Sequence, residues 1–281
     1  PYFYPLVAPN GGIVTRGWPM DDSDPKELKD HVHQKSAWFC HGDVIPEGLE
    51  IKDKIKGVKG VDFWSEHKGH GRIVCTSRDV KKAKDRVSLI TQNEWRTADG
   101  VKILDETRTI HLSQVPAGWL LTFEIDLHAS VYPITFGDTK EGSLGVRVPW
   151  TMTESKGKGK LTNAEGKSGM KAIWGHASPW CDYSGPVRVM GQPETTVVAG
   201  VAILDHPSNP VKAYWHSRDY GLMAANPFGR KAFPGVPKDT SVVKLARGEH
   251  LKLRYGLLLH SGDVKDGKVA ETAEKFFKSK E

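Results

Sequence analysis

The segment Leu121–His128 has the sequence LTFEIDLH, and the segment Leu251–His260 has the sequence LKLRYGLLLH. In both, apolar residues occupy every second position, and in the first the intervening residues are Thr, Glu, Asp and His. Side chains of a strand point alternately to its two faces, so this period of two predicts half-buried strands. Further strands are predicted at residues 72–76, 86–94, 102–112, 143–153, 170–175, 195–204 and 241–246.

One helix is predicted over Lys268–Lys280, where apolar residues recur at spacings of three and four between charged ones. Turn-forming residues separate the strands, and the chain contains neither a long linker nor an internal repeat. Many long strands in a chain that no linker divides into domains predict a mainly β fold, a large antiparallel β-sandwich with one C-terminal helix. We expect a single domain over residues 1–281.

The composition is typical of a globular protein. Of the 281 residues, 38% are hydrophobic and 26% are charged, and the net charge is +6. The lysines cluster at residues 52–59, 81–84 and 156–160, beside glycine or acidic residues, as in solvated loops. No groove-reading element accompanies them, so no nucleic-acid partner is predicted. No apolar run approaches the length of a membrane span.

The chain has three cysteines, Cys40, Cys75 and Cys181, in apolar or aromatic surroundings and without a CxxC pair. We therefore expect three buried free thiols rather than a zinc or redox site. The first residue is Pro1 and not methionine, which is the pattern of a processed N-terminus. Whether an export signal preceded it stays open at this stage.

Three segments combine titratable side chains with aromatic rings or glycines. The first contains DHVHQ at residues 30–34 and WFCHGD at residues 38–43. In an extended segment the two histidines of an HxH pattern point the same way, as ligands of a divalent metal would. Its candidate substrate-binding residues are His31, His33, Trp38, His41 and Asp43. The alternative is a metal held by His31, His33 and His41.

The second segment is TFGDTKEG at residues 135–142. Asp138 and Glu141 are candidate catalytic carboxylates, and Lys140 is a candidate substrate-binding cation beside them. The flanking glycines let the backbone pass close to a ligand. The same three charges would also serve as a structural ion-pair network.

The third segment, Asp205–Arg230, has the sequence DHPSNPVKAYWHSRDYGLMAANPFGR. Its three prolines and two glycines exclude one continuous helix or strand, so we interpret it as a pocket-forming loop. The alternative is a well-packed loop without a ligand. The catalytic candidates are His206 and His216. The substrate-binding candidates are Trp215, Arg218, Asp219 and Asn226, together with the more distant Arg16.

These three segments are predicted to converge on one cleft, because active sites gather such groups from distant parts of a chain. A carboxylate, Glu141 or Asp138, would act as base and a histidine, His206 or His216, as proton donor. The chain lacks a GxSxG elbow, a P-loop and a GxGxxG turn. This argues against the serine hydrolases that use that elbow and against nucleotide or dinucleotide enzymes.

Six motifs, spread over residues 1–262, carry a resemblance to a known family. They are PYFYPLVAPNGGIVTRGWP, DHVHQKSAWFCHGD, GVDFWSE, TFGDTKEGSLGVRV, IWGHASPWCDYSG and DHPSNP…YWHSRDYGLMAANPFG. Together they resemble a bacterial family of unknown function labelled "methane oxygenase PmoA-like". The resemblance implies a soluble, β-rich protein with a galactose-mutarotase-like supersandwich. This chain departs from the family in the insertion at residues 45–60 and in Gln34, where a second histidine is common, and both changes weaken a metal site.

Three functions follow as hypotheses. The first is a carbohydrate-active enzyme, a hydrolase, lyase or epimerase, with a small carbohydrate as its partner. The second is a non-catalytic carbohydrate-binding protein. The third, which the family label implies, is an oxygenase that depends on a divalent metal; the first two need no cofactor. The resemblance also implies a periplasmic or secreted mature protein, with a cytoplasmic location and the oligomeric state left open.

Overall fold

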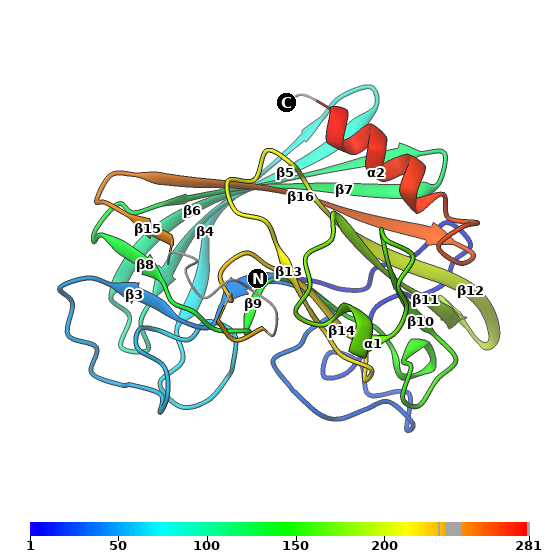
Figure 1. Cartoon of the computed structure of the whole chain (residues 1–281), viewed down its shortest axis with the longest axis horizontal. Helices are drawn as coiled ribbons and strands as arrows, with labels where there is room; N and C mark the ends of the chain where they lie inside the picture. The colour runs from blue at the N-terminus through cyan, green and yellow to red at the C-terminus, as the bar shows by residue number, and fades with distance from the viewer. Residues whose placement is uncertain (230, 234–242, 280–281) are drawn as a thin grey trace.

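The computed structural model describes the chain except residues 230, 234–242 and 280–281. It confirms the predicted mainly β fold with antiparallel sheets and a C-terminal helix. Figure 1 shows a large sheet across the molecule, with the helix α2 against one face and a smaller sheet below the other.

The large sheet has eight strands in the order β10-β11-β12-β16-β7-β6-β5-β4, and all its pairs are antiparallel. Its centre contains the two segments of alternating sequence, which pair with Leu121 opposite Leu257. The strand bounds are Arg72–Lys82 (β4), Arg86–Arg96 (β5), Lys102–Val115 (β6), Gly118–His128 (β7), Lys160–Asn163 (β10), Trp180–Val189 (β11), Gln192–Asp205 (β12) and His250–Ser261 (β16).

Two smaller sheets complete the strand structure of the described residues. The five-stranded sheet has the order β1-β2-β9-β14-β13, and the three-stranded sheet has the order β15-β8-β3. The bounds of the first are Tyr2–Phe3 (β1), Ala37–His41 (β2), Gly142–Arg147 (β9), Tyr214–Ser217 (β13) and Leu222–Asn226 (β14). Those of the second are Val44–Pro46 (β3), Ile134–Phe136 (β8) and Val243–Leu245 (β15).

The main core lies between the eight-stranded and five-stranded sheets. Phe3 of β1 packs edge-on against Phe123 of β7, with 5.8 Å between ring centroids, and Phe39 of β2 packs against Trp95 of β5 at 6.3 Å. Along β12, Val201 and Ile203 belong to this core, as their spacing of two requires. This packing of two sheets face to face is the predicted sandwich.

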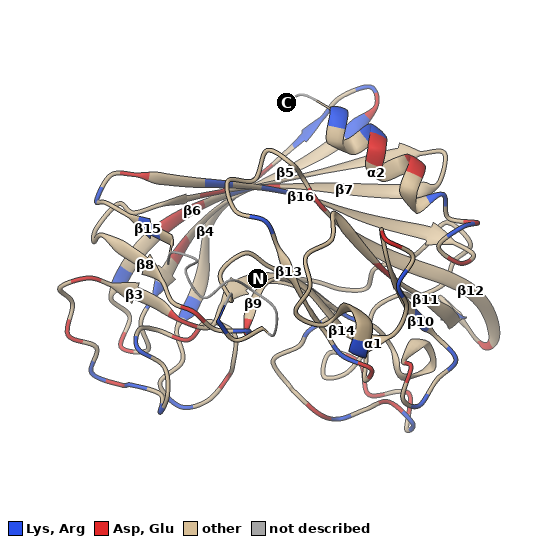
Figure 2. Ribbon diagram, viewed as in Figure 1, with Lys and Arg blue, Asp and Glu red and all other residues tan. Residues whose placement is uncertain are grey.

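The helix α2 (Val269–Lys278) covers the opposite face of the eight-stranded sheet. Its apolar residues pack on the alternate positions of β12 and β16, Ala202, Leu204 and Leu258. Its charged residues are exposed, and they appear as the blue and red segments of the helix in Figure 2. The predicted helix over 268–280 is therefore correct in place, and its end at Lys280 lies outside the described residues.

Two predicted strands differ from the structure. The strand predicted over 143–153 ends at Arg147, because Pro149 cannot continue a ladder, and one 3-10 turn follows at Trp150–Met152. The strand predicted over 170–175 is instead the one-turn helix α1 (Met170–Ile173), between Gly169 and Gly175. The apolar run there is too short for its periodicity to distinguish a helix from a strand. Of the strand predicted over 241–246, residues 243–245 are observed, and 241–242 lie outside the described residues.

The segment predicted as one pocket-forming loop, Asp205–Arg230, contains a hairpin. β13 and β14 pair from Tyr214–Asn226 to Ser217–Met223, and Arg230 lies outside the described residues. The prolines at 207, 210 and 227 all fall outside the two strands, which is why their presence did not exclude a hairpin.

The prediction of three buried thiols is correct for Cys40 and Cys181 and wrong for Cys75, which is exposed. Cys75 lies on β4, the edge strand of the eight-stranded sheet, and most of that strand faces solvent. None of the described helices has the length and apolar character needed to cross a membrane. That residues 1–281 form a single domain stays a prediction.

The contact between α2 and the sheet predicts an unequal effect of two neighbouring substitutions. Phe276 is buried against the sheet, whereas the adjacent Phe277 is only partly buried. Phe276→Ala should lower the free energy of unfolding by about 3–5 kcal/mol, because the cavity adds to the lost burial. Phe277→Ala is the matched control and should cost clearly less. Equal losses in urea denaturation would contradict this packing.

Candidate functional site

A cleft of about 520 Å³ lies beside the five-stranded sheet. Its lining comes from five parts of the chain: residues 31–34, 62–67, 140–141, Met170 and residues 216–220. The three segments singled out by the sequence therefore each contribute to the same cleft. Its volume is in the range of small-molecule sites.

The hairpin β13–β14 shows how the fold directs side chains into the cleft. Neighbouring residues of a strand point to opposite faces. His216 lines the cleft, whereas Trp215 is fully buried in the main core, and its indole N–H donates to the carbonyl of Ser178 at 3.0 Å. Trp215 is therefore a core residue, and we revise its assignment as a substrate-binding residue.

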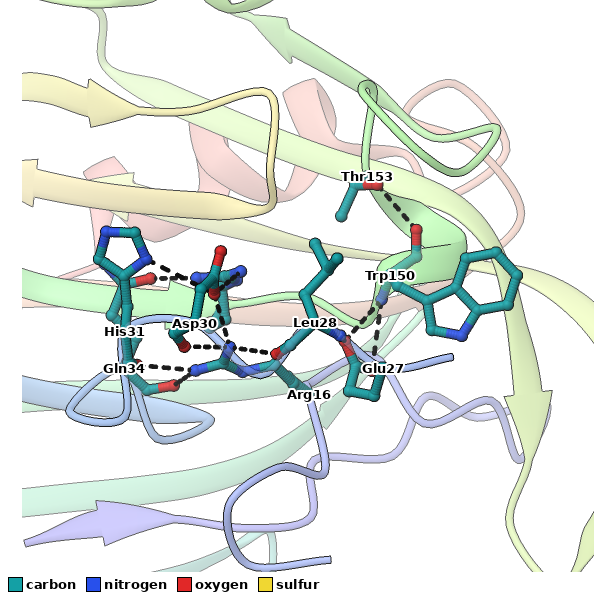
Figure 3. Close-up of polar contacts among 9 residues, drawn as sticks. Arg16, Glu27, Leu28, Asp30, His31, Gln34, Trp150 and Thr153 are labelled. Atoms are coloured by element: carbon teal, nitrogen blue, oxygen red, sulfur yellow. Dashed lines mark hydrogen bonds and ion pairs between the residues drawn. The ribbon is translucent and has the colours of Figure 1, made fainter. Parts of the chain in front are cut away.

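The loop that carries His31 and His33 is fixed from below by Arg16 (Figure 3). The guanidinium of Arg16 is fully buried and donates to the backbone carbonyls of four loop residues at 2.8–2.9 Å. These carbonyls belong to Leu28, Asp30, His31 and Gln34. Arg16 also pairs with the carboxylate of Asp30 at 3.0 Å. Arg16 thus holds the loop and does not reach a ligand, contrary to its assignment from the sequence.

A second buried guanidinium, that of Arg147 on β9, binds the same loop. It donates to Asp30 Oδ1 and to Gln34 Oε1, both at 2.5 Å. Its flat face lies 4.6 Å from the ring centroid of Tyr220, and the ring of His31 stacks on Tyr220 at 4.9 Å. Both guanidinium and imidazole therefore contact the phenol ring, so Tyr220 is a packed part of the cleft floor.

The charges of this network are stabilised by each other. Burial, and then the charge of Arg147, lower the pKa of Arg16 to about 10, so it remains protonated at neutral pH. Burial alone would raise the pKa of Asp30, but the charge and hydrogen bond of Arg147 outweigh it and leave that pKa below its ordinary value. Asp30 is therefore an anion between two cations.

The opposite wall is a tight turn at residues 62–65. Asp62 accepts hydrogen bonds from the backbone N–H groups of Trp64 and Ser65 and from the hydroxyl of Ser65. This turn places Trp64 between His33 and His216, with ring centroids 6.5 Å and 6.4 Å away. The sequence analysis quoted this segment without assigning it to the site, although its Asp-x-Trp-Ser pattern is a local turn signal.

Two histidines of the cleft are neutral near neutral pH. Burial is the largest cause and lowers the pKa of His33 to about 4 and that of His216 to about 3. The charge of His31 contributes in both cases, and those of Arg218 and Lys140 contribute for His216. A neutral imidazole offers one donor and one acceptor. These rings are therefore suited to hydrogen bonds with a ligand.

The remaining charged groups at the cleft are Lys140, Glu141, Arg218 and Asp219. Lys140 Nζ lies 2.5 Å from Glu141 Oε1, so these two residues form an ion pair at the cleft rim. Of the fifteen residues assigned from the sequence, the cleft contains His31, His33, Lys140, Glu141, His216, Arg218 and Asp219.

Several residues assigned to the site from the sequence lie outside the cleft and form hydrogen bonds with the backbone instead. His41 is buried, with Nε2 at 2.8 Å from the carbonyl of Gly137. Asp43 accepts the N–H of Gly60 at 2.7 Å, and Asp138 accepts the N–H of Lys231 at 3.0 Å. The amide of Asn226 donates to Thr139 and accepts two backbone N–H groups. Their assignments are revised to structural roles, since each makes a side-chain hydrogen bond to the backbone and none lines the cleft.

His206 and Trp38 are also displaced from the cleft. His206 directly follows β12 and packs edge-on against Phe276 of α2, on the far face of the large sheet. Trp38 lies flat against Gly145, where an added Cβ would come within 2.8 Å of its ring. It lines a neighbouring pocket of about 450 Å³, which shares His33, Trp64 and Ser65 with the cleft.

The metal alternative does not fit the donor set. His31 and His33 lie 5.7 Å apart between ring centroids, but His41 is buried in a separate contact with Gly137. Among the described residues, no group of three or more His, Cys, Asp or Glu side chains is arranged to hold a metal ion. We therefore derive no chemistry from a bound metal.

Fold and cleft together define a β-sandwich protein with a polar cleft lined mostly by loops beside its five-stranded sheet. A family described as "Family of unknown function (DUF6807)" matches residues 1–274, and the chain belongs to this family. The search of curated proteins found no match.

Among solved structures, the chain is similar to a 4-alpha-glucanotransferase from Thermococcus litoralis, with 8% sequence identity and a TM-score of 0.28. The match covers 89% of this chain and 32% of that one, so this chain spans about a third of the enzyme's length. A likeness at this level supports no conclusion about the site.

The Arg16 network predicts a large loss of stability on its removal. Arg16→Met removes the buried guanidinium that donates to four carbonyls and pairs with Asp30, and the free energy of unfolding should fall by about 3–5 kcal/mol. The control is Arg188→Met, because Arg188 pairs with Asp24 at 3.1 Å on the surface. That change should cost about 0–1 kcal/mol. Similar losses in chemical denaturation would show that the loop does not depend on Arg16.

The lowered pKa values predict how stability depends on pH. In the unfolded chain His33 and His216 bind a proton near pH 6.5, whereas in the folded protein they do so near pH 4 and 3. Stability from the neutral rings is thus complete above pH 6.5 and declines as the pH falls toward 4. His216→Gln should reduce this slope, and NMR should show a neutral His216 ring at pH 6. A ring that titrates near its ordinary value would contradict the assignment.

Proposed function

We propose that this protein is a carbohydrate-active enzyme, a hydrolase, lyase or epimerase, and that the cleft is its active site. One observation carries the proposal: the cleft combines neutral imidazoles with carboxylates and cations at the same surface. Sugar hydroxyls both donate and accept hydrogen bonds, so they require such a mixed lining.

Within this proposal Glu141 is the acid/base residue. It lies at the rim of the cleft, and its pairing with Lys140 fixes the position of the carboxylate. A positioned carboxylate can remove a proton from a sugar carbon or hydroxyl, or activate a water. Lys140 would stabilise negative charge that develops on the substrate oxygen.

His216 has a different role from the proton donor assigned by sequence. Because its pKa is about 3, the imidazolium form is scarce near neutral pH. The neutral ring orients a hydroxyl through a hydrogen bond. His206 lies on the far face of the large sheet and takes no part.

The same observation also favours a second candidate function, a non-catalytic carbohydrate-binding protein. Two histidines kept neutral by burial serve recognition as well as catalysis, and Glu141 paired to Lys140 would then accept hydroxyl groups. The metal-dependent oxygenase of the PmoA-like label is not favoured, because the candidate ligands are not brought together. The galactose-mutarotase-like fold and a periplasmic or secreted location remain parts of the proposal.

The test begins with a thermal-shift screen of monosaccharides and disaccharides, followed by product analysis for each sugar that binds. Glu141→Gln should lower turnover by about 10²–10⁴-fold, while the Kd changes only a few-fold, because the amide keeps the size of the side chain. Glu165→Gln, on an exposed turn that does not line the cleft, is the control and should retain full turnover.

Three outcomes separate the candidates. A selective loss in Glu141→Gln supports the enzyme. Full activity in that variant removes Glu141 from the chemistry. Sugar binding without turnover by the parent protein would replace the enzyme with the binding protein.

A further inference from the structure

Arg218 differs from the other cationic side chains around the cleft because no anionic side chain among the described residues pairs with it. It begins the turn between β13 and β14, where its N–H donates to the carbonyl of Leu222. In the described part of the chain, its guanidinium forms neither an ion pair nor a hydrogen bond with another residue. By contrast, Lys140 pairs with Glu141, and Arg147 binds Asp30 and Gln34 below the floor.

The position of Arg218 is nevertheless well determined. Its guanidinium carbon lies 5.1 Å from the ring centroid of Trp174, so the ring supports the flat face of the cation. The turn itself is anchored, since the carbonyl of Asp219 accepts N–H groups of Glu154 and Ser155 and the hydroxyl of Tyr183. Stacking occupies the face of a guanidinium and leaves its N–H edge free, and this edge matches a carboxylate in geometry.

We propose that the substrate of the cleft is an acidic sugar, a uronic acid or a glycoside of one, whose carboxylate pairs with the edge of Arg218. This inference rests on the proposed function and specifies its substrate class. Neighbouring Asp219 and His216 then face hydroxyl groups of the same ring. Arg218 lies close enough to His216 that its charge contributes to the lowered pKa of that imidazole.

A carboxylate fits this site better than a phosphate. Arg218 supplies one positive charge, and the other cation of the cleft lining, Lys140, is already neutralised by Glu141. A sugar phosphate carries up to two negative charges and usually requires more than one cationic or backbone donor. A single unpaired guanidinium corresponds to one monoanion.

The experiment compares the Kd of D-galacturonate with those of its methyl ester, D-galactose and galactose 6-phosphate, and repeats the series with the glucose compounds. The methyl ester keeps the shape of the acid and removes its charge. For the parent protein we expect the acid to bind roughly 10–100-fold more tightly than the ester, the range of a charge-assisted hydrogen bond. Added salt should reduce this preference.

Arg218→Gln should abolish the preference while the ester and the neutral sugar bind as before, and Arg218→Lys should restore it in part. Arg188→Gln, a control whose arginine pairs with Asp24 and does not line the cleft, should retain it. Equal binding of acid and ester by the parent, or a preference that persists in Arg218→Gln, would overturn the acidic-sugar assignment. Tighter binding of the phosphate than of the acid would also overturn it. If no sugar of any charge binds, the proposed function itself fails.

Discussion

Arg16 and Arg147, two fully buried guanidiniums, share the carboxylate of Asp30. Moving two cations out of water is unfavourable. It is tolerated here because Arg16 donates to four backbone carbonyls of the loop and Arg147 donates to the side chain of Gln34. The loop has no regular secondary structure of its own before β2, so these bonds determine the positions of His31 and His33. The cleft therefore depends on an ion cluster whose three residues do not line it.

The second constraint is the alternation of side chains along the five-stranded sheet. One face of β2, β9, β13 and β14 contributes to the core against the eight-stranded sheet, and the hairpin then sends His216 to the opposite side. Rigid strands consequently support a site that consists mostly of loop residues. Two contacts also restrict long side chains at the cleft. Lys140 pairs with Glu141, and Arg218 stacks on Trp174.

The sequence predicts the architecture well where one physical signal dominates. Leu121–His128 and the helix near residue 273 follow their periods, and both occur as predicted. The direction of a side chain cannot be predicted in this way. No local signal shows that Trp215 and Arg16 are buried whereas His216 and Arg218 line the cleft. Asp43 and Asp138 have site chemistry, but backbone N–H groups distant in the sequence engage them, and the Asn226 amide donates to the distant carbonyl of Thr139. Such tertiary partners leave no trace in spacing or composition.

The exposure of Cys75 has a practical consequence for biophysical work. Burial raises the pKa of the Cys40 and Cys181 thiols well above their ordinary range, and both are inaccessible, whereas Cys75 is exposed on the edge strand β4. Thiol-directed reagents react with accessible thiolates. The native cysteines therefore offer one accessible attachment point for a fluorophore or spin label, on the edge of the large sheet.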